Sequence, residues 1–268
     1  MKKMKKVLAV ALSLVMAGSL AACGSSSTET KASETAGAAE TAAESTAESG
    51  SEAASEVSTD GKVYNIGICQ LIQHDALDAA TKGFEDALKE TFGDNVKFDE
   101  QNAQGDSATC ATIINSFVSN NDDLILANAT AALQAAAAGT NTIPILGTAV
   151  TDYGVALDID NFDGTVGGNI SGTADLAPLD GQADMLHELF PDAKKIGLLY
   201  CSAEANSKFQ VDTIKGYLEK LGYTCEYYAF SDSNDLSSVC TSAANDSDVI
   251  YVPTDNTVAN NTEIVNNI

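Results

Sequence analysis

Short apolar runs alternate with amphipathic segments along the chain from Val63 onward. Segment 75–92 is of the amphipathic kind, because Leu77, Phe84 and Leu88 recur at spacings that place them on one helical face. Alternation of short apolar runs with such helices is typical of repeated βα units. The pattern therefore predicts an α/β fold with parallel sheets and flanking helices.

The predicted elements can be assigned in chain order. We expect strands at 64–71, 96–101, 123–127, 143–146, 195–201, 224–230 and 249–252. We expect helices at 75–92, after a cap at Asp106, in an alanine-rich segment that ends at Gly139, and at 180–190, 207–221 and 235–244. A glycine-rich stretch, 153–179, interrupts this order, and we interpret it as a hinge and crossover between two lobes. The lobes are then 61–172 and 173–268.

After the strand at 249–252 the chain starts a further helix and stops at Ile268 without a capping residue, a glycine or a charged tail. We expect the chain to be incomplete, with the C-terminal part of the second lobe missing.

The first sixty residues do not follow the βα pattern. Residues 1–22 combine four lysines, an apolar run and small residues, which is the order of a secretory signal peptide. The junction before Cys23 resembles a bacterial lipobox, so we expect Cys23 to be lipidated and to anchor the protein to the membrane. Residues 23–60 are rich in Ser, Thr, Ala and Glu and lack aromatic residues, which predicts a disordered acidic tether.

The formal net charge is −24, and the chain contains no arginine. We exclude nucleic acid as a partner, because binding phosphates requires basic patches. The lack of arginine also means that a bound carboxylate must be held by backbone N–H groups, hydroxyls and amides.

Five cysteines remain besides Cys23, and no pair of them has CxxC spacing. Most lie in apolar patterns, so we interpret them as small hydrophobic residues, with disulfides or metal ligation as the alternative. They are Cys69, Cys110, Cys201, Cys225 and Cys240.

Polar residues gather where the predicted strands end. In the central stretch 194–210 a buried strand leads through a short polar loop directly into a helix, where free backbone N–H groups can hold an anion. Carboxylates at Asp152 or Asp255 can pair with an ammonium group, which suits a zwitterionic amino acid; helix capping is the alternative for each residue. The candidate ligand-binding residues are Gln70, His74, Asn128, Ala129, Thr130, Thr148, Thr151, Asp152, Ser202, Glu204, Ala205, Asn206, Asp255 and Asn256.

The sequence offers few residues for enzyme catalysis. His74 and His187 are the two histidines, and we expect His187 to be an exposed helix residue. The chain lacks the GxSxG, P-loop, HExxH and GxGxxG motifs, and it has no clustered metal-ligand spacing. We therefore expect neither catalysis nor a cofactor nor a metal.

Several motifs occur in a fixed order along the chain: Gln70 with 74–78, 147–152, 172–178, 202–207 with Gln210, and 253–257. Together they resemble the ABC transporter substrate-binding family that includes tryptophan and tyrosine binders. The resemblance covers about 62–268.

The resemblance implies a two-lobe periplasmic-binding-protein fold of type I that closes on an aromatic or related amino acid. It also implies delivery of that ligand to a membrane permease with its ATPase, outside the cytoplasm. Two alternatives remain open at this point: a sugar, nucleoside or purine receptor on the same fold, and a ligand sensor for a membrane kinase.

Overall fold

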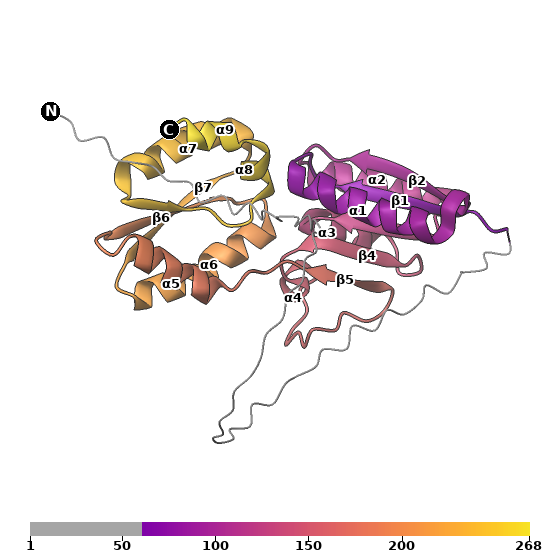
Figure 1. Cartoon of the computed structure of the whole chain (residues 1–268), viewed down its shortest axis with the longest axis horizontal. Coiled ribbons are helices and arrows are strands. Elements are labelled where there is room, and N and C mark those ends of the chain that lie inside the picture. Colours follow the sequence, from indigo (N-terminus) through magenta and orange to yellow (C-terminus); the bar gives the residue numbers. More distant parts are fainter. Residues whose placement is uncertain (1–60) are drawn as a thin grey trace, which may run out of the picture. The chain divides into compact units, whose positions relative to one another are not determined.

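The computed structural model describes residues 61–268 (Figure 1). The predicted signal segment 1–22, the lipidation site Cys23 and the tether to residue 60 lie outside the described residues. Within 61–268, no helix combines the length and the apolar character needed to cross a membrane.

Five parallel strands form the first sheet, in the spatial order β2-β1-β3-β4-β5. The strands are β1 (Tyr64–Gln70), β2 (Val96–Asn102), β3 (Leu124–Asn128), β4 (Ile145–Val150) and β5 (Ile170–Ala174). The helices between them are α1 (Asp75–Phe92), the 3-10 turn η1 (Gly93–Asn95), α2 (Ser107–Asn120), α3 (Thr130–Gly139) and α4 (Tyr153–Ala156).

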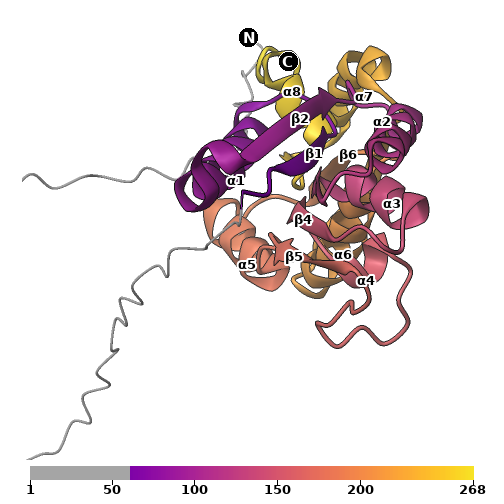
Figure 2. The same cartoon turned by 90° about the vertical axis from the view of Figure 1, so that its right-hand side faces the viewer.

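Side chains of β1 alternate between two apolar layers. Ile66 and Ile68 pack with Phe84 of α1, whereas Cys69 packs with Phe117 of α2. This period of two places successive residues on opposite faces of the sheet. Figure 2 accordingly shows α1 on one side of the strands and α2 and α3 on the other.

Three parallel strands form the second sheet, in the order β7-β6-β8. They are β6 (Lys195–Cys201), β7 (Thr224–Phe230) and β8 (Val249–Tyr251). The helices of this region are α5 (Leu179–Leu189), α6 (Ala205–Lys220), α7 (Ser233–Asp246), α8 (Asn256–Asn260) and α9 (Thr262–Asn266).

The central strand β6 also contributes to two layers. Ile196, Leu198 and Tyr200 belong to the cluster with α5 and α6. Leu199 and Cys201 belong to the cluster with α7, α8 and α9. Figure 1 shows α5 and α6 on one face of β6 and α7 on the other. Both sheets thus bury both faces, as parallel sheets with crossover helices do.

Most predicted elements are confirmed, including α1, β6 and β7 at their predicted bounds. The stretch 153–179, interpreted as a hinge and crossover, also contains α4 and β5, which were not predicted. Strand four was placed too early: β4 runs to Val150, so Thr148 lies in a strand rather than in a loop. The predicted lobe boundary at 172 falls inside β5, which pairs with β4 in the first sheet.

Close backbone contact explains how β5 fits against β4. A Cβ atom on Gly172 would collide with the backbone oxygen of Gly147 and with the hydroxyl group of Tyr153. Tyr153 is 5% exposed and its Oη donates to the backbone oxygen of Thr173 at 3.3 Å. Tyr153 is therefore a packing residue that covers two glycines, which requires both to lack a side chain.

The five cysteines within 61–268 are unpaired, and all but the half-buried Cys225 are buried. Cys69, Cys110, Cys201 and Cys240 pack within the apolar clusters, as expected of small hydrophobic side chains.

Candidate ligand-binding site

The fourteen predicted side chains lie at or beyond the carboxyl ends of strands. They come from the end of β1 and the start of α1, from the β3–α3 junction, from β4 and its following turn, and from the turns after β6 and β8. Loops at this edge of parallel sheets are the usual place for ligands in such folds. The hydrogen bonds of each side chain decide which of them remain available to a ligand.

Gln70 and Asn128 form a buried polar network that attaches α1 to the sheet. Gln70 accepts a hydrogen bond from the Thr81 hydroxyl at 2.7 Å and donates to Asp78 at 2.7 Å. Asn128 donates its amide to the Leu77 carbonyl and to Thr81, each at 2.9 Å. Gln70 and Asn128 are 2% and 0% exposed, so their amide groups position α1 rather than contact solvent.

The N-terminus of α3 lacks a capping side chain. Ala129, which precedes the helix, has φ 94° and ψ 161° and makes no side-chain cap. Within 61–268, the Oγ1 atom of Thr130 and the Oδ1 atom of Asn128 are buried and without a hydrogen-bond partner. A positive φ at a residue with a side chain costs about 1–3 kcal/mol and is typical of functional sites. An anion at this helix end would satisfy the free N–H groups and the Thr130 hydroxyl.

Three predicted residues lie at the end of β4. The backbone oxygen of Thr148 accepts from the Ala129 amide at 3.0 Å, which fixes the turn before α3. The buried Thr151 donates its hydroxyl to the carboxylate of Asp175. Asp152 caps α4, accepting from the Val155 amide at 2.8 Å.

Asp175, the partner of Thr151, was not among the predicted site residues. It directly follows β5, and its amide donates to the Val150 carbonyl at 3.1 Å. Asp175 is exposed to solvent, and the surrounding protein atoms nevertheless raise the pKa of its carboxyl group. Its position after a strand was the missing signal, because β5 itself was not predicted.

A hydrogen bond joins His74, the residue before α1, to Asn256, the first residue of α8. The distance from His74 Nε2 to Asn256 Oδ1 is 3.2 Å. The amide nitrogen of Asn256 donates to Glu204 at 2.7 Å, so its oxygen faces the imidazole ring. His74 therefore carries a proton on Nε2 in this contact.

Glu204 lies in the turn after β6 and is 7% exposed. Its Oε1 atom accepts from the amide and the hydroxyl of Thr257, and its Oε2 atom accepts from the amide and the side chain of Asn256 and from Asn206. Five donors thus converge on this carboxylate, which holds the first turn of α8. A ligand would have to compete with these contacts.

Asp255 is 4% exposed and also accepts hydrogen bonds from backbone amides. Its Oδ2 atom accepts from the Cys201 amide at 2.6 Å, and its Oδ1 atom accepts from the Val258 amide at 2.9 Å. Burial and the neighbouring charge of Glu204 raise the pKa of Asp255 to about 7. If Asp255 also paired with a ligand ammonium, as predicted, it would do so in addition to these two hydrogen bonds.

The remaining predicted residues line the same turn. Asn206 donates to the Thr254 carbonyl at 3.0 Å, and the exposed Ser202 donates its hydroxyl to the Phe230 carbonyl at 3.0 Å. Ala205, the first residue of α6, is half-buried. Gln210, one turn further along α6, accepts from both the amide and the hydroxyl of Thr254.

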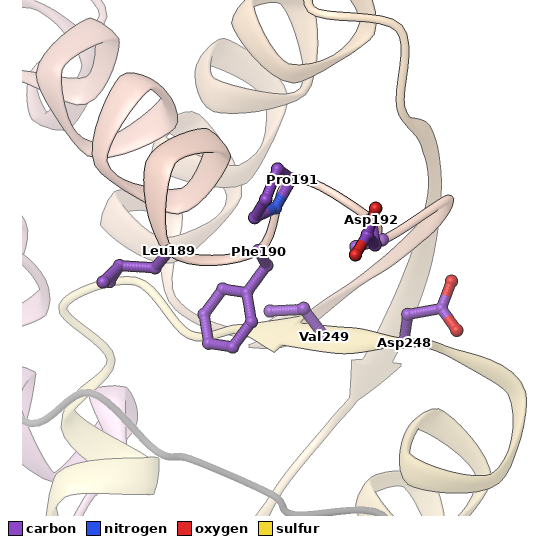
Figure 3. A pocket seen from close by; sticks show the side chains of 7 residues that line it. Leu189, Phe190, Pro191, Asp192, Asp248 and Val249 are labelled. Carbon is purple, nitrogen blue, oxygen red and sulfur yellow. The ribbon is translucent and has the colours of Figure 1, made fainter.

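A surface depression lies at the opposite ends of β6 and β8. Phe190, Pro191 and Val249 form its apolar part, and Asp248 borders it (Figure 3). Asp248 accepts from the amides of Lys194 and Lys195 at 2.9 and 3.0 Å, which fixes the start of β6. Because it lies at the amino ends of the strands, we do not assign the ligand to it. Residues 61–268 contain no group of three or more side chains suited to holding a metal ion.

Comparisons with known proteins agree on one family. A family model described as ABC transporter substrate binding protein matches residues 65–268. A tyrosine-binding protein from Clostridioides difficile is 42% identical over 214 residues, which cover 78% of this chain and 62% of that relative. The chain therefore spans less than two thirds of the length of that relative.

Two solved structures share the fold closely. An ABC domain from Streptococcus pneumonia in complex with L-Trp has a TM-score of 0.72 and 37% identity, over 76% of this chain and 70% of its own. A conserved domain protein from Vibrio cholerae has a TM-score of 0.72 and 35% identity over the same shares of both chains. The two parallel sheets with flanking helices are the periplasmic-binding-protein fold of type I.

Proposed function

Because the chain belongs to the family of ABC transporter substrate-binding proteins, we propose that it captures an aromatic amino acid and delivers it to the permease and ATPase of an importer. Membership of the family is established by the match over residues 65–268. The ligand and its delivery are proposals, since the chain spans 62% of its tyrosine-binding relative.

The uncapped N-terminus of α3 is the observation that carries the proposal. The positive φ of Ala129 supports a carboxylate at this helix end, and so does the Thr130 hydroxyl, which has no hydrogen-bond partner within 61–268. Backbone N–H groups and a hydroxyl are the donors that a chain without arginine can offer. The amino-acid carboxylate is therefore assigned to this helix end.

The other predicted residues are proposed to complete the site. Thr148, Thr151 and Asp152 follow the neighbouring strand, and His74 and Asn256 contact each other across 182 positions. The buried Gln70, Asn128, Glu204 and Asp255 are proposed to act by holding the helices that carry the contacts. Ser202, Ala205 and Asn206 are proposed to border the ligand from the start of α6.

The aromatic class of ligand is proposed from the relatives. One is a tyrosine-binding protein and another was solved with L-Trp. Identities of 42% and 37% over three quarters of the chain support transfer of the ligand class, without choosing between tyrosine and tryptophan.

The cellular setting is proposed from the first residues. The apolar run before Cys23 supports export, and lipidation of Cys23 would hold the protein at the outer surface of the cell membrane. Mass spectrometry of the membrane fraction tests this: a diacylglyceryl group on Cys23 is expected, and an unmodified Cys23 would contradict it.

A thermal-shift screen tests the ligand. The protein would be melted with each of the twenty amino acids, common sugars and purines, because a ligand that binds only the folded state raises its stability, by about 2.7 kcal/mol at one hundred times Kd. A rise limited to tyrosine, tryptophan or phenylalanine is the expected result. A rise with a sugar or purine instead would overturn the amino-acid assignment, and a cooperative melt that no compound shifts would also contradict it.

A further inference from the structure

Asp175 lies at the carboxyl edge of the first sheet, directly after the last residue of β5. Val150 and Ala174 are paired at the ends of β4 and β5, and the Asp175 amide extends this pairing by a hydrogen bond to the Val150 carbonyl. The pairing of Asn128 with Thr148 places the start of α3 at the same edge. Asp175 and the N-terminus of α3 thus follow strands that are separated only by β4.

The carboxylate of Asp175 is oriented by one hydroxyl and has no cationic partner within 61–268. Thr151 donates to it, and Tyr153 is close enough for the Asp175 charge to help raise the pKa of its phenol, after burial, to about 12. The lysine ion pairs of the described residues involve other carboxylates. This exposed carboxylate has no cation beside it within 61–268, and a cationic group on a ligand would favour its charged form.

The other carboxylates of the site already accept hydrogen bonds from backbone amides. Asp152 caps α4, and Glu204 and Asp255 hold α8 and the end of β6. Asp175 makes no such cap, which distinguishes it from all three.

We propose that Asp175 binds the ammonium group of the amino-acid ligand whose carboxylate lies at the N-terminus of α3. The inference rests on the proposed function and names a binding residue for it. Strands β3 and β5 are two strand spacings apart, about 10 Å. An amino acid with its two charged groups about 3 Å apart and a hydrogen bond of about 2.8–2.9 Å at each end reaches about 9 Å, which is comparable with this separation. Thr151 fixes the carboxylate in place for this contact.

Calorimetric titration of paired ligands tests the inference. L-tyrosine and L-tryptophan would be compared with their deaminated analogues, 3-(4-hydroxyphenyl)propionate and indole-3-propionate, on wild type and Asp175→Asn. We expect Asp175→Asn to weaken binding of the amino acids by about 30-fold or more, because it removes the charged partner of the ammonium. Binding of the analogues should change less than about threefold. The exposed Asp160, replaced by Asn, serves as the matched control.

The outcomes separate this inference from the proposed function. Wild type that binds no aromatic amino acid would overturn both. Wild type that binds, with Asp175→Asn binding L-tyrosine equally well, would overturn the inference alone, as would an equal loss for the amino acid and its analogue. Thr151→Val keeps the charge and covers the case in which Asp175→Asn does not fold: a loss for L-tyrosine that the deaminated analogue does not share supports the inference, and an equal effect on both contradicts it.

Discussion

Glu204 accepts two hydrogen bonds from Thr257, one from its backbone amide at 2.9 Å and one from its hydroxyl at 2.8 Å. The contact joins the turn before α6 to the first turn of α8, 53 positions later. Helix α8 has five residues, which is too short to be stable by itself. Its position therefore depends on the carboxylates that bind its N-terminus.

Replacing Glu204 by Gln should destabilise the protein by about 2 kcal/mol, because an amide NH₂ would face donors and charge-assisted bonds would be lost. Urea unfolding monitored by circular dichroism measures the change. The exposed Glu188 on α5, replaced by Gln, is the control and should stay within about 0.5 kcal/mol. An unchanged midpoint for Glu204→Gln would show that α8 is held by other contacts.

Asp255 should make stability depend on pH in an unusual direction. Its pKa is raised from 3.8 to about 7, so between these values the folded protein keeps a proton that the unfolded chain releases. The stability contributed by the neutral form is complete below about pH 4 and is lost as the pH rises through about 7, with a slope of at most about 1.4 kcal/mol per pH unit.

The difference in unfolding free energy between wild type and Asp255→Asn isolates this effect. Between pH 5 and pH 8, wild type should lose unfolding free energy relative to Asp255→Asn. Urea titration at each pH measures both values. A constant difference would mean that Asp255 is ionised in the folded protein throughout this range.

Gly172→Ala should destabilise the protein by about 2 kcal/mol or more, because the added methyl group meets the Gly147 backbone and the Tyr153 hydroxyl. Tyr153→Phe in the same chain should recover part of the loss. Gly216 is the control, since a Cβ there meets nothing within 4 Å and alanine favours the interior of α6 by about 0.5–1 kcal/mol. If Gly172→Ala and wild type melted at the same temperature, the close contact between β4 and β5 would be contradicted.

The same contact shows why β5 was not predicted from the sequence. Prediction worked where residues alternate between two apolar layers, as in β6, whose side chains are nearly all buried. In β5, four of five residues are exposed and Gly172 replaces an apolar side chain, so the hydrophobic pattern is missing. The strand forms because its backbone pairs with β4, and such pairing leaves no signal in the order of apolar residues.

The sequence predicted that the candidate residues lie at strand ends, and the structure places them there. Nothing in the sequence shows, however, that Gln70 bonds Thr81 or that Glu204 bonds Thr257. These partners lie up to 53 positions apart, and only the fold brings them together. Whether a side chain is free to bind a ligand therefore depends on its tertiary contacts. Its place at the edge of the sheet, by contrast, follows from the local sequence.

Thr130→Val should separate binding from stability. The hydroxyl of Thr130 is buried without a partner within 61–268, so valine of similar shape should leave the unfolding free energy unchanged or raise it by up to about 1 kcal/mol. If the ligand carboxylate accepts from this hydroxyl, affinity for L-tyrosine should fall about tenfold or more in calorimetric titration. Thr112→Val, on the exposed face of α2, should change neither quantity much. Lower stability with unchanged affinity would assign Thr130 to the fold and move the carboxylate away from α3, because an uncapped helix end is useful to a ligand only if the ligand supplies its missing acceptor.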